Sequence, residues 1–405
     1  MLDQCTTSLI QRTEGIKSHL KKWRQHFHRY PELSFQEKET SEYIIRQLEL
    51  LDVFTIETGV AKYGVIATLS TGDSPTFGLR ADMDALPIVE KTDLPYASEY
   101  PGIMHACGHD AHMAILLGVA TIIAEDYKKG DFKGTVKLIF QPAEEDTDSY
   151  GKTGAPYFIE SGVVENLDAV LALHMCPWQE TGSIQLHKGA SMANIDNFVL
   201  KINGKGAHGG YPHESKDPIW MLSFILQGLY GLISRKLNPL EAGTISIGQI
   251  NGGQTPNVIP DTVEIRGTIR SYSDKVRQQL IEEINQVAQM VYSFSGGYEL
   301  EIEKGEPALD NNPALIDLIE DNAQKLYPLM KIISEPYGLG GEDFGHFTKV
   351  MPGAMFFLGC AKAGDTKKVL HASDFIIDEE AMPIGVAILT ATLYQGLKEE
   401  SKITI

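Results

Sequence analysis

The sequence has no long apolar run, and no stretch approaches the roughly 18–20 consecutive apolar residues that a membrane-spanning helix requires. Residues 1–15 (MLDQCTTSLIQRTEG) contain neither the basic segment nor the apolar segment that is typical of a secretory signal peptide. We therefore expect a cytoplasmic protein that has no membrane partner.

Basic residues and cysteines are also scarce. The chain has 35 Lys and Arg against 54 Asp and Glu, and its formal net charge of -19 would repel nucleic-acid phosphates. We therefore expect no nucleic-acid partner. Only four cysteines occur in 405 residues (Cys5, Cys107, Cys176 and Cys360), which does not resemble a disulfide framework. A cysteine beside histidines is better tested as a metal ligand.

Short apolar segments alternate with helical patterns along most of the chain. Five segments have the length and composition of buried strands: GVIATL (64–69), TFGL (76–79), TVKLIF (135–140), AVLAL (169–173) and AMFFLG (354–359). Helical patterns occupy residues 16–27, 44–51 and 112–127. Strands that alternate with helices predict an α/β domain with a largely parallel sheet and helices on both faces.

Residues 195–304 have a different pattern. Strand-like segments occur at 197–204, 243–250, 261–270 and 298–304, and helical stretches at 218–235 and 274–294. The resulting order β-α-β-β-α-β is typical of a ferredoxin-like unit. We therefore predict an inserted α+β domain at 195–304 within a larger domain formed by 1–194 and 305–405.

Polar clusters follow three of the predicted strands. RADMDALP (80–87) follows the second strand, QPAEE (141–145) follows the third, and His174 follows the fourth. Open α/β sheets bind their ligands at the carboxyl ends of the strands, so these clusters are expected to meet in one crevice.

The segment MHACGHDAHMA (104–114) adds Cys107, His109 and His112 at the start of a helix. Thiolate and imidazole are ligands that zinc and similar metals prefer. A buried thiol beside a structural histidine is the alternative interpretation. The convergence with the strand-end clusters favours a metal site.

The acidic pairs divide into different roles. A solvated loop is the ordinary interpretation of Glu144 and Glu145, but they follow a buried strand, which favours one metal ligand and one general base. Asp82 and Asp84 could bind metal or orient the ligating histidines, and we favour orientation. His371, in VLHASDF (369–375), is a lone histidine that these patterns alone do not single out.

Seven motifs then occur in a fixed order: RADMDALP, CGHDAHMA, FQPAEE, GKGAHGGYPHESKDP, GGQTPNVIPD, GGEDF and LHASDF. Together they resemble the metal-dependent aminoacylase and carboxypeptidase family. The most similar branch contains hippurate hydrolases, indole-acetyl-amino-acid hydrolases and bacterial N-acyl-amino-acid amidohydrolases. Other branches have His-x-Asp where this chain has Asp82-Met83-Asp84, and aspartate where it has Cys107.

The resemblance implies two divalent metal ions per chain, zinc or manganese, with cobalt or nickel as alternatives. The implied metal ligands are Cys107, His109, Glu145, His174 and His371. Glu144 matches the general base for a metal-activated water.

The resemblance also assigns roles within the inserted domain, as a lid and dimerisation unit of a homodimer. His208 matches a histidine that polarises the scissile carbonyl from the partner subunit, although a turn histidine is the alternative. Asn257 and Arg270 match groups that hold the substrate carboxylate, a task that suits the planar guanidinium of arginine. Arg270 could equally be a surface strand residue.

The implied activity is hydrolysis of the amide bond of N-acyl-L-amino acids. A dipeptidase or carboxypeptidase, and an N-acetyl-diaminopimelate deacetylase, are alternatives that use the same site. A non-catalytic metal-binding relic is a third alternative, and the intact Glu144 and ligand positions argue against it.

Overall fold

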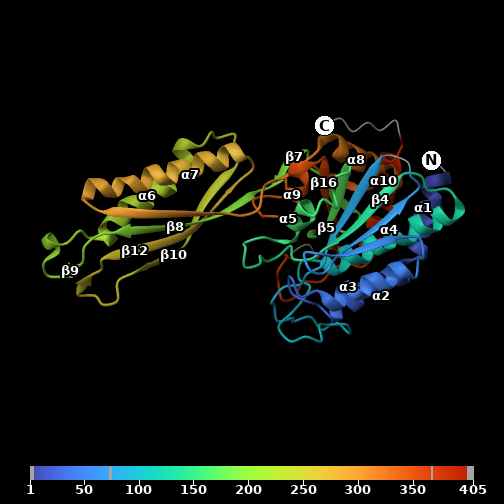
Figure 1. Ribbon diagram of the computed structural model, residues 1–405, viewed down its shortest axis with the longest axis horizontal. Helices are drawn as coiled ribbons and strands as arrows, with labels where there is room; N and C mark the ends of the chain where they lie inside the picture. The colour runs from blue at the N-terminus through green and yellow to red at the C-terminus, as the bar shows by residue number, and fades with distance from the viewer. Residues whose placement is uncertain (1–3, 73–74, 366–367, 399–405) are drawn as a thin grey trace. The chain divides into compact units, whose positions relative to one another are not determined.

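The computed structural model describes residues 4–72, 75–365 and 368–398. The chain divides into two compact units, which we call the larger and the smaller unit (Figure 1). The larger unit comprises Met1–Gly189, Asp310–Pro336 and His346–Ile405. The smaller unit comprises Ala190–Leu309 and Tyr337–Gly345.

An eight-stranded sheet forms the centre of the larger unit. Its strands are β1 (Thr55–Val60), β2 (Gly64–Ser70), β3 (Thr76–Asp82), β4 (Thr135–Gln141), β5 (Ala169–Glu180), β6 (Ser183–Gln185), β15 (Lys331–Ile333) and β16 (Gly353–Ala361). Their order in the sheet is β1-β2-β4-β3-β5-β16-β6-β15. The central strands β4, β3, β5 and β16 pair in parallel, whereas β1–β2, β2–β4 and β16–β6 are antiparallel. The predicted, largely parallel sheet is therefore confirmed.

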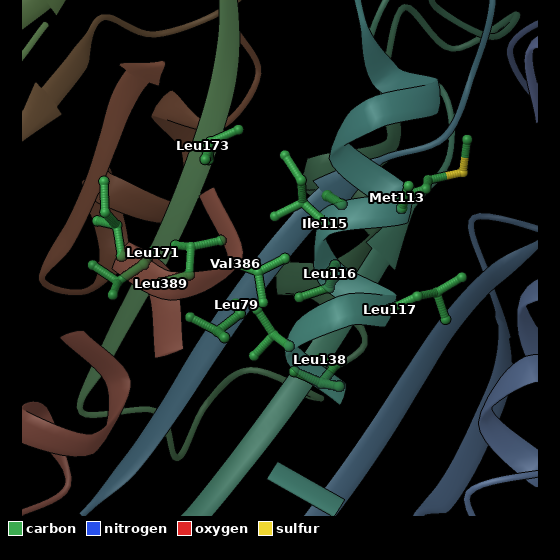
Figure 2. Close-up of a cluster of buried hydrophobic side chains, with 14 of the residues drawn as sticks. Leu79, Met113, Ile115, Leu116, Leu117, Leu138, Leu171, Leu173, Val386 and Leu389 are labelled. Carbon is green, nitrogen blue, oxygen red and sulfur yellow. The ribbon is translucent and has the colours of Figure 1, made fainter. Parts of the chain in front are cut away.

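One face of this sheet is covered by the helices α4 (His109–Lys129) and α10 (Ala381–Gly396). The side chains that meet there, in Figure 2, are Leu79, Leu138, Leu171 and Leu173 from the strands, Ile115 and Leu116 from α4, and Val386 and Leu389 from α10. A methyl group on Gly118 of α4 would lie 2.7 Å from Leu20 and from Val386, so α4 packs closely between α2 (Lys17–Arg29) and α10. Each fully buried leucine of this kind stabilises the fold by about 1.5–3 kcal/mol.

The opposite face of the sheet is covered as well. Successive strand residues point to opposite faces, so Gly78 lies on the face away from Leu79. A methyl group on Gly78 would lie 2.8 Å from Leu167, and one on Gly64 would lie 2.6 Å from Phe158 in α5 (Gly154–Glu160). Both faces are therefore buried, and the predicted α/β class is confirmed.

The smaller unit has its own antiparallel sheet and hydrophobic core. Its strands β8 (Asn194–Asn203), β10 (Gly243–Gly252), β12 (Thr262–Ser271) and β13 (Gly297–Lys304) lie in the order β10-β12-β8-β13. The helices α6 (Pro218–Lys236) and α7 (Asp274–Ala288) pack on it through a cluster that includes Phe198, Ile225 and Leu280. Asp217 caps α6 by accepting hydrogen bonds from the N–H groups of Ile219 and Trp220. The chain order β-α-β-β-α-β is the predicted ferredoxin-like order.

The remaining elements are short or peripheral: α1 (Gln4–Gly15), α3 (Lys38–Glu49), β7 (Gly189–Met192), β9 (Ala207–His208), η1 (Pro212–Glu214), β11 (Val258–Ile259), η2 (Gln289–Phe294), β14 (Leu309–Asn311), α8 (Pro313–Leu326) and α9 (Gly345–Val350). Within the described ranges, no helix combines the length and the apolar character needed to cross a membrane.

Three predicted boundaries near the site or in the smaller unit differ from the structure. The helix expected over 274–294 ends at Ala288 and continues as the 3₁₀ helix η2. The strand expected to end before His174 continues to Glu180, so His174 lies inside β5 rather than after it. β3 likewise extends to Asp82, which places the first carboxylate of RADMDALP within the strand.

Candidate metal centre

Cys107 and His109 are presented by the turn that leads into α4. Gly108, between them, has φ +99°, a left-handed conformation that glycine adopts at no steric cost. The α-helix begins at His109, and the N–H groups of Ala111 and His112 donate to the Gly108 carbonyl. The Sγ atom of Cys107 lies 3.4 Å from Nε2 of His174, and both residues are buried. The turn therefore brings a thiol against a histidine of the neighbouring strand β5.

Two of the histidines are oriented by hydrogen bonds to backbone carbonyls. Nδ1 of His109 lies 2.9 Å from the carbonyl oxygen of Asp84, and Nδ1 of His174 lies 2.8 Å from that of Met175. A carbonyl oxygen only accepts, so each Nδ1 carries a proton, and Nε2 is the ring nitrogen that remains to bind a metal ion. Nε2 of His109 is buried and has no hydrogen-bond partner among the residues that the structure describes. Both imidazoles are thus arranged as metal ligands.

Glu145 and His371 approach the same point from two further loops. The Oε1 atom of Glu145 lies 3.2 Å from Nε2 of His371 and 3.8 Å from Nε2 of His109. The Glu145 N–H donates to Oδ2 of Asp84 over 2.9 Å. His371 has φ +62°, and its N–H donates to the Ala106 carbonyl over 2.8 Å. The loop that carries His371 is therefore tied to the turn that carries Cys107.

These ligand atoms form overlapping groups. Atoms within 4.8 Å of one another come from Cys107, His109 and His174, from Cys107, Glu145 and His371, and from His109, Glu144 and Glu145. Nitrogen, sulfur and carboxylate oxygen are the ligands that zinc and related divalent ions take in proteins. The structure thus brings together all five residues predicted as ligands, together with Glu144. Their assignment as ligands stays a prediction.

The electrostatics of the cluster fit a cation. Burial, together with the charges of Glu145 and Glu144, raises the pKa of the Cys107 thiol well above its usual value. Burial lowers the pKa of His109, but the charges of Asp82, Asp84 and Glu145 outweigh it and raise that pKa to about 10. Burial lowers the pKa of His174 well below its usual value. The cluster therefore holds excess negative charge and protons that a divalent cation would displace.

His112 differs from these histidines because both of its ring nitrogens are hydrogen-bonded within the protein. Its Nδ1 lies 2.6 Å from Oδ1 of Asp82, and its Nε2 accepts the Met175 N–H over 2.9 Å. Both ring nitrogens are used, so His112 has no lone pair for a metal and instead fixes Asp82 and β5. Asp82 also accepts from Arg80 over 2.6 Å, and its Oδ2 lies 3.7 Å from Nε2 of His109. Asp82 and Asp84 thus both lie beside His109, and their role in orienting it stays a prediction.

Sequence patterns did not point to two residues that support these loops. Ser34 donates to Oδ2 of Asp84 over 2.6 Å, and buried Glu37 accepts the Ala143 N–H over 2.8 Å. Both come from the segment PELSFQE (31–37), far from the metal motifs in sequence. A buried glutamate in that segment has no periodic signature that distinguishes it from the exposed glutamates of α3.

The remaining predicted residues lie in the smaller unit. His208 on β9 pairs with Val258 on β11, and its Nδ1 accepts the Gly210 N–H over 3.0 Å. The carbonyl of Asn257 accepts the Gly209 N–H over 2.8 Å, so His208 and Asn257 lie on adjacent segments, and both are exposed. Arg270, on β12, is partly buried, and its Nε donates to Thr268 over 3.2 Å.

A thiol, imidazoles and carboxylates gathered beside a mostly parallel sheet form a set of donors that suits a catalytic divalent metal ion. The model of the peptidase family M20/M25/M40 matches residues 78–395, and the chain belongs to this family.

The chain is similar to known proteins over nearly its whole length. It is 40% identical to an N-acetyl-L-cysteine deacetylase of Bacillus subtilis, over 94% of this chain and 89% of that protein. It is 36% identical to thermostable carboxypeptidase 1 of Saccharolobus solfataricus, over 93% of this chain and 96% of that protein. Its fold matches the crystal structure of the YXEP protein of Bacillus subtilis, a dinuclear metal-binding peptidase of the M20 family. That match has a TM-score of 0.82 and 32% identity, over 95% and 99% of the two chains.

Proposed function

We propose that this protein hydrolyses the amide bond of N-acyl-L-amino acids with two divalent metal ions, zinc or manganese. The observation that carries the proposal is the set of overlapping groups that Cys107, His109, Glu145, His174 and His371 form beside Glu144, in which Cys107, His109 and His174 are buried and His371 is exposed. Five protein ligands suit a pair of ions better than a single tetrahedral one. Two similar proteins support the proposal, one named as a deacetylase of an N-acyl amino acid and one as a dinuclear metal-binding peptidase.

Each proposed site residue of the larger unit has a separate task. When bound, the two ions supply Lewis acidity, which acidifies a water molecule and polarises the amide carbonyl. Glu144 is the general base that takes the proton from that water and later gives it to the leaving amine nitrogen. Glu145, its neighbour, is a ligand, and its backbone is held by Asp84. Asp84 and Asp82 keep His109 oriented.

The proposal extends to the inserted segment 195–304, which would act as a lid and dimerisation domain. His208, with its Nδ1 occupied by the Gly210 N–H, has Nε2 available to donate to the developing oxyanion. Asn257 and Arg270 would bind the substrate carboxylate, for which the guanidinium of Arg270 is geometrically suited. In a homodimer, the His208 that serves one metal site would come from the partner chain.

Metal analysis and a substrate screen test the proposal together. We expect about two divalent ions per chain in active protein, since five ligands suit a co-catalytic pair. N-acetyl and N-benzoyl amino acids should be hydrolysed with a higher kcat/KM than dipeptides. Activity that persists in metal-free protein would refute the mechanism.

A carboxypeptidase or dipeptidase is the second candidate. It is favoured by the similarity to the Saccharolobus carboxypeptidase, at an identity close to that of the deacetylase. Both reactions break an amide bond next to a carboxylate and need the same site. A kcat/KM for a dipeptide at least tenfold above that for every N-acyl amino acid would select this candidate instead.

A further inference from the structure

We infer that Glu37 is a positioning residue that holds the Glu144–Glu145 pair in place through the backbone of Ala143. This inference rests on the proposed function, because it assigns Glu37 a role in the same metal centre. Glu37 lies in a different part of the sequence from every metal motif, in the segment before α3.

The geometry of the loop shows why it needs support. Ala143 has φ +55°, a left-handed conformation that is strained for a residue other than glycine. It is fully buried, its N–H donates to Glu37 over 2.8 Å, and its carbonyl accepts the Gly154 N–H over 2.7 Å. A methyl group on Gly154 would lie 1.8 Å from the Pro142 carbonyl oxygen, so the second contact depends on a glycine. The strained residue is therefore clamped at both of its peptide groups.

The strained conformation matters because Ala143 immediately precedes Glu144. The backbone torsions of one residue set the direction in which the following residues leave it. A return of Ala143 to an extended conformation would therefore redirect both Glu144 and Glu145. Glu145 must meet His109 and His371 on one side, while Glu144 faces the same cluster from the next position.

The segment that carries Glu37 also holds the second acidic loop. The Ala85 N–H donates to the Glu32 carbonyl over 2.8 Å, and Ser34 donates to Asp84 over 2.6 Å. The same Oδ2 of Asp84 accepts the Glu145 N–H. Residues 32–37 thus connect the two loops whose relative position determines the metal centre.

A purely local role for Glu37 does not account for these contacts. Glu37 occupies the N-cap position of α3, but its side chain makes no capping hydrogen bond to that helix. Its Oε2 is buried and has no hydrogen-bond partner within the described part of the chain. Burial and the nearby Asp84 raise the pKa of Glu37 to about 8, so glutamine closely matches its neutral form. The carboxyl group is therefore directed at the Ala143 backbone rather than at its own helix.

The experiment compares Glu37→Gln, Glu37→Ala and the matched control Glu42→Ala, a glutamate exposed on α3 whose ion pairs are long, at 3.9 Å. Calorimetric titration with Mn²⁺ or Zn²⁺ alone gives metal affinity, and N-acetyl amino acid turnover gives kcat and KM. We expect Glu37→Ala to weaken metal affinity by about tenfold or more and to lower kcat further, with little change in KM. Glu37→Gln retains an acceptor and should stay within about threefold of the parent, as should Glu42→Ala.

A rescue variant separates positioning from general stability. Glycine adopts the left-handed conformation freely, so Ala143→Gly in the Glu37→Ala protein should restore part of the metal affinity. Should Glu37→Ala not fold, Glu37→Met, which keeps the volume but loses the carboxyl acceptor, is compared with Glu37→Gln instead. A lower Tm with metal affinity and kcat within threefold of the parent would overturn the inference, as would equal losses in the glutamine and alanine variants.

The metal titration keeps the inference distinct from the proposed function. A parent protein that binds metal but cleaves no N-acyl amino acid would refute the proposed reaction, and the relative metal affinities would still decide the role of Glu37. A parent that binds no divalent ion would overturn both.

Discussion

In the larger unit, Cys107, His109 and His174 are buried, and both histidines donate a hydrogen bond to a backbone carbonyl, whereas in the smaller unit His208 and Asn257 are exposed. The first arrangement suits metal ligands, because a metal site requires fixed distances and one free lone pair on each imidazole. The second suits groups that meet a substrate only after a conformational change. The larger unit therefore carries the preformed part of the proposed site, and the smaller unit carries residues that we propose to reach the substrate on closure.

Each unit also contains its own buried ion pair. In the larger unit, Arg24 donates to Asp110, which follows His109, and His28 contacts the same carboxylate. In the smaller unit, Arg277 donates to Asp196 through two nitrogens. The first pair supports the turn that carries the predicted ligands Cys107 and His109, and the second joins α7 to β8. Disruption of the first pair should therefore affect metal binding, whereas disruption of the second should not.

The largest expected effect is on the preformed part of the site. Glu144→Gln should lower kcat by about 10³-fold or more while both metal ions remain bound, because the amide is nearly isosteric but cannot accept a proton. Fixed-time activity assays and metal analysis on the same protein measure the turnover and the metal content. Turnover within a few-fold of the parent would remove Glu144 from the role of general base.

The second prediction tests whether the two parts come from different chains. His208→Ala and Glu144→Gln homodimers should both be nearly inactive, but a mixed dimer would contain one site with both residues intact. Full subunit exchange of an equal mixture gives one half heterodimers, so about a quarter of the parental activity should return. Size-exclusion chromatography establishes that the parents are dimers. Exchanged heterodimers that stay inactive, or a fully active monomer, would rule out a shared site.

The third prediction concerns metal affinity rather than turnover. Cys107→Ala removes a thiolate ligand, and it should weaken binding of at least one ion by roughly 10–100-fold. Competition with a chelator of known affinity measures the change. The same substitution at buried Cys176, which lies outside the ligand groups, is the control and should leave both affinities unchanged.

Disrupting the two buried ion pairs should have the smallest effect on activity but a large effect on stability. Arg24→Met and Arg277→Met each remove the arginine partner of a buried carboxylate, which should lower the free energy of unfolding by about 3–5 kcal/mol. Denaturant titration measures this loss. Only Arg24→Met should also weaken metal binding, and equal metal affinities in the two variants would contradict the proposed division between the units.

The larger-unit pair also predicts a pH dependence. Burial opposes ionisation of Asp110, but Arg24 and His28 outweigh it and hold the pKa of Asp110 well below its usual value. A carboxyl whose pKa is lower in the folded state contributes stability above its unfolded pKa, near 4, and loses it as the pH falls further. Thermal unfolding at a series of pH values should therefore show a loss of stability below about pH 4 that Asp110→Asn reduces.

The sequence alone was sufficient for the fold class and for which residues gather at the centre. Alternating apolar strands and amphipathic helices are local patterns, and they predicted the parallel sheet and the β-α-β-β-α-β insertion. The strand-end position of Glu145 also followed from the chain, since parallel strands bring their carboxyl ends to one edge, whereas Cys107 and His109 lie in the turn before α4. The helix α10 escaped prediction because it is apolar on nearly every side and has no amphipathic period.

Only the tertiary structure decided how those residues are held. Strand lengths depend on pairing partners, so the extension of β5 beyond His174 to Glu180 needed β16 beside it. The exclusion of His112 as a ligand required the Met175 N–H and Asp82, which lie on two different strands. The contact of Glu37 with Ala143 joins residues 106 positions apart, and no local pattern records a hydrogen bond of that range. Sequence periodicity reports which face of an element is buried, whereas long-range polar contacts arise only when distant segments pack together.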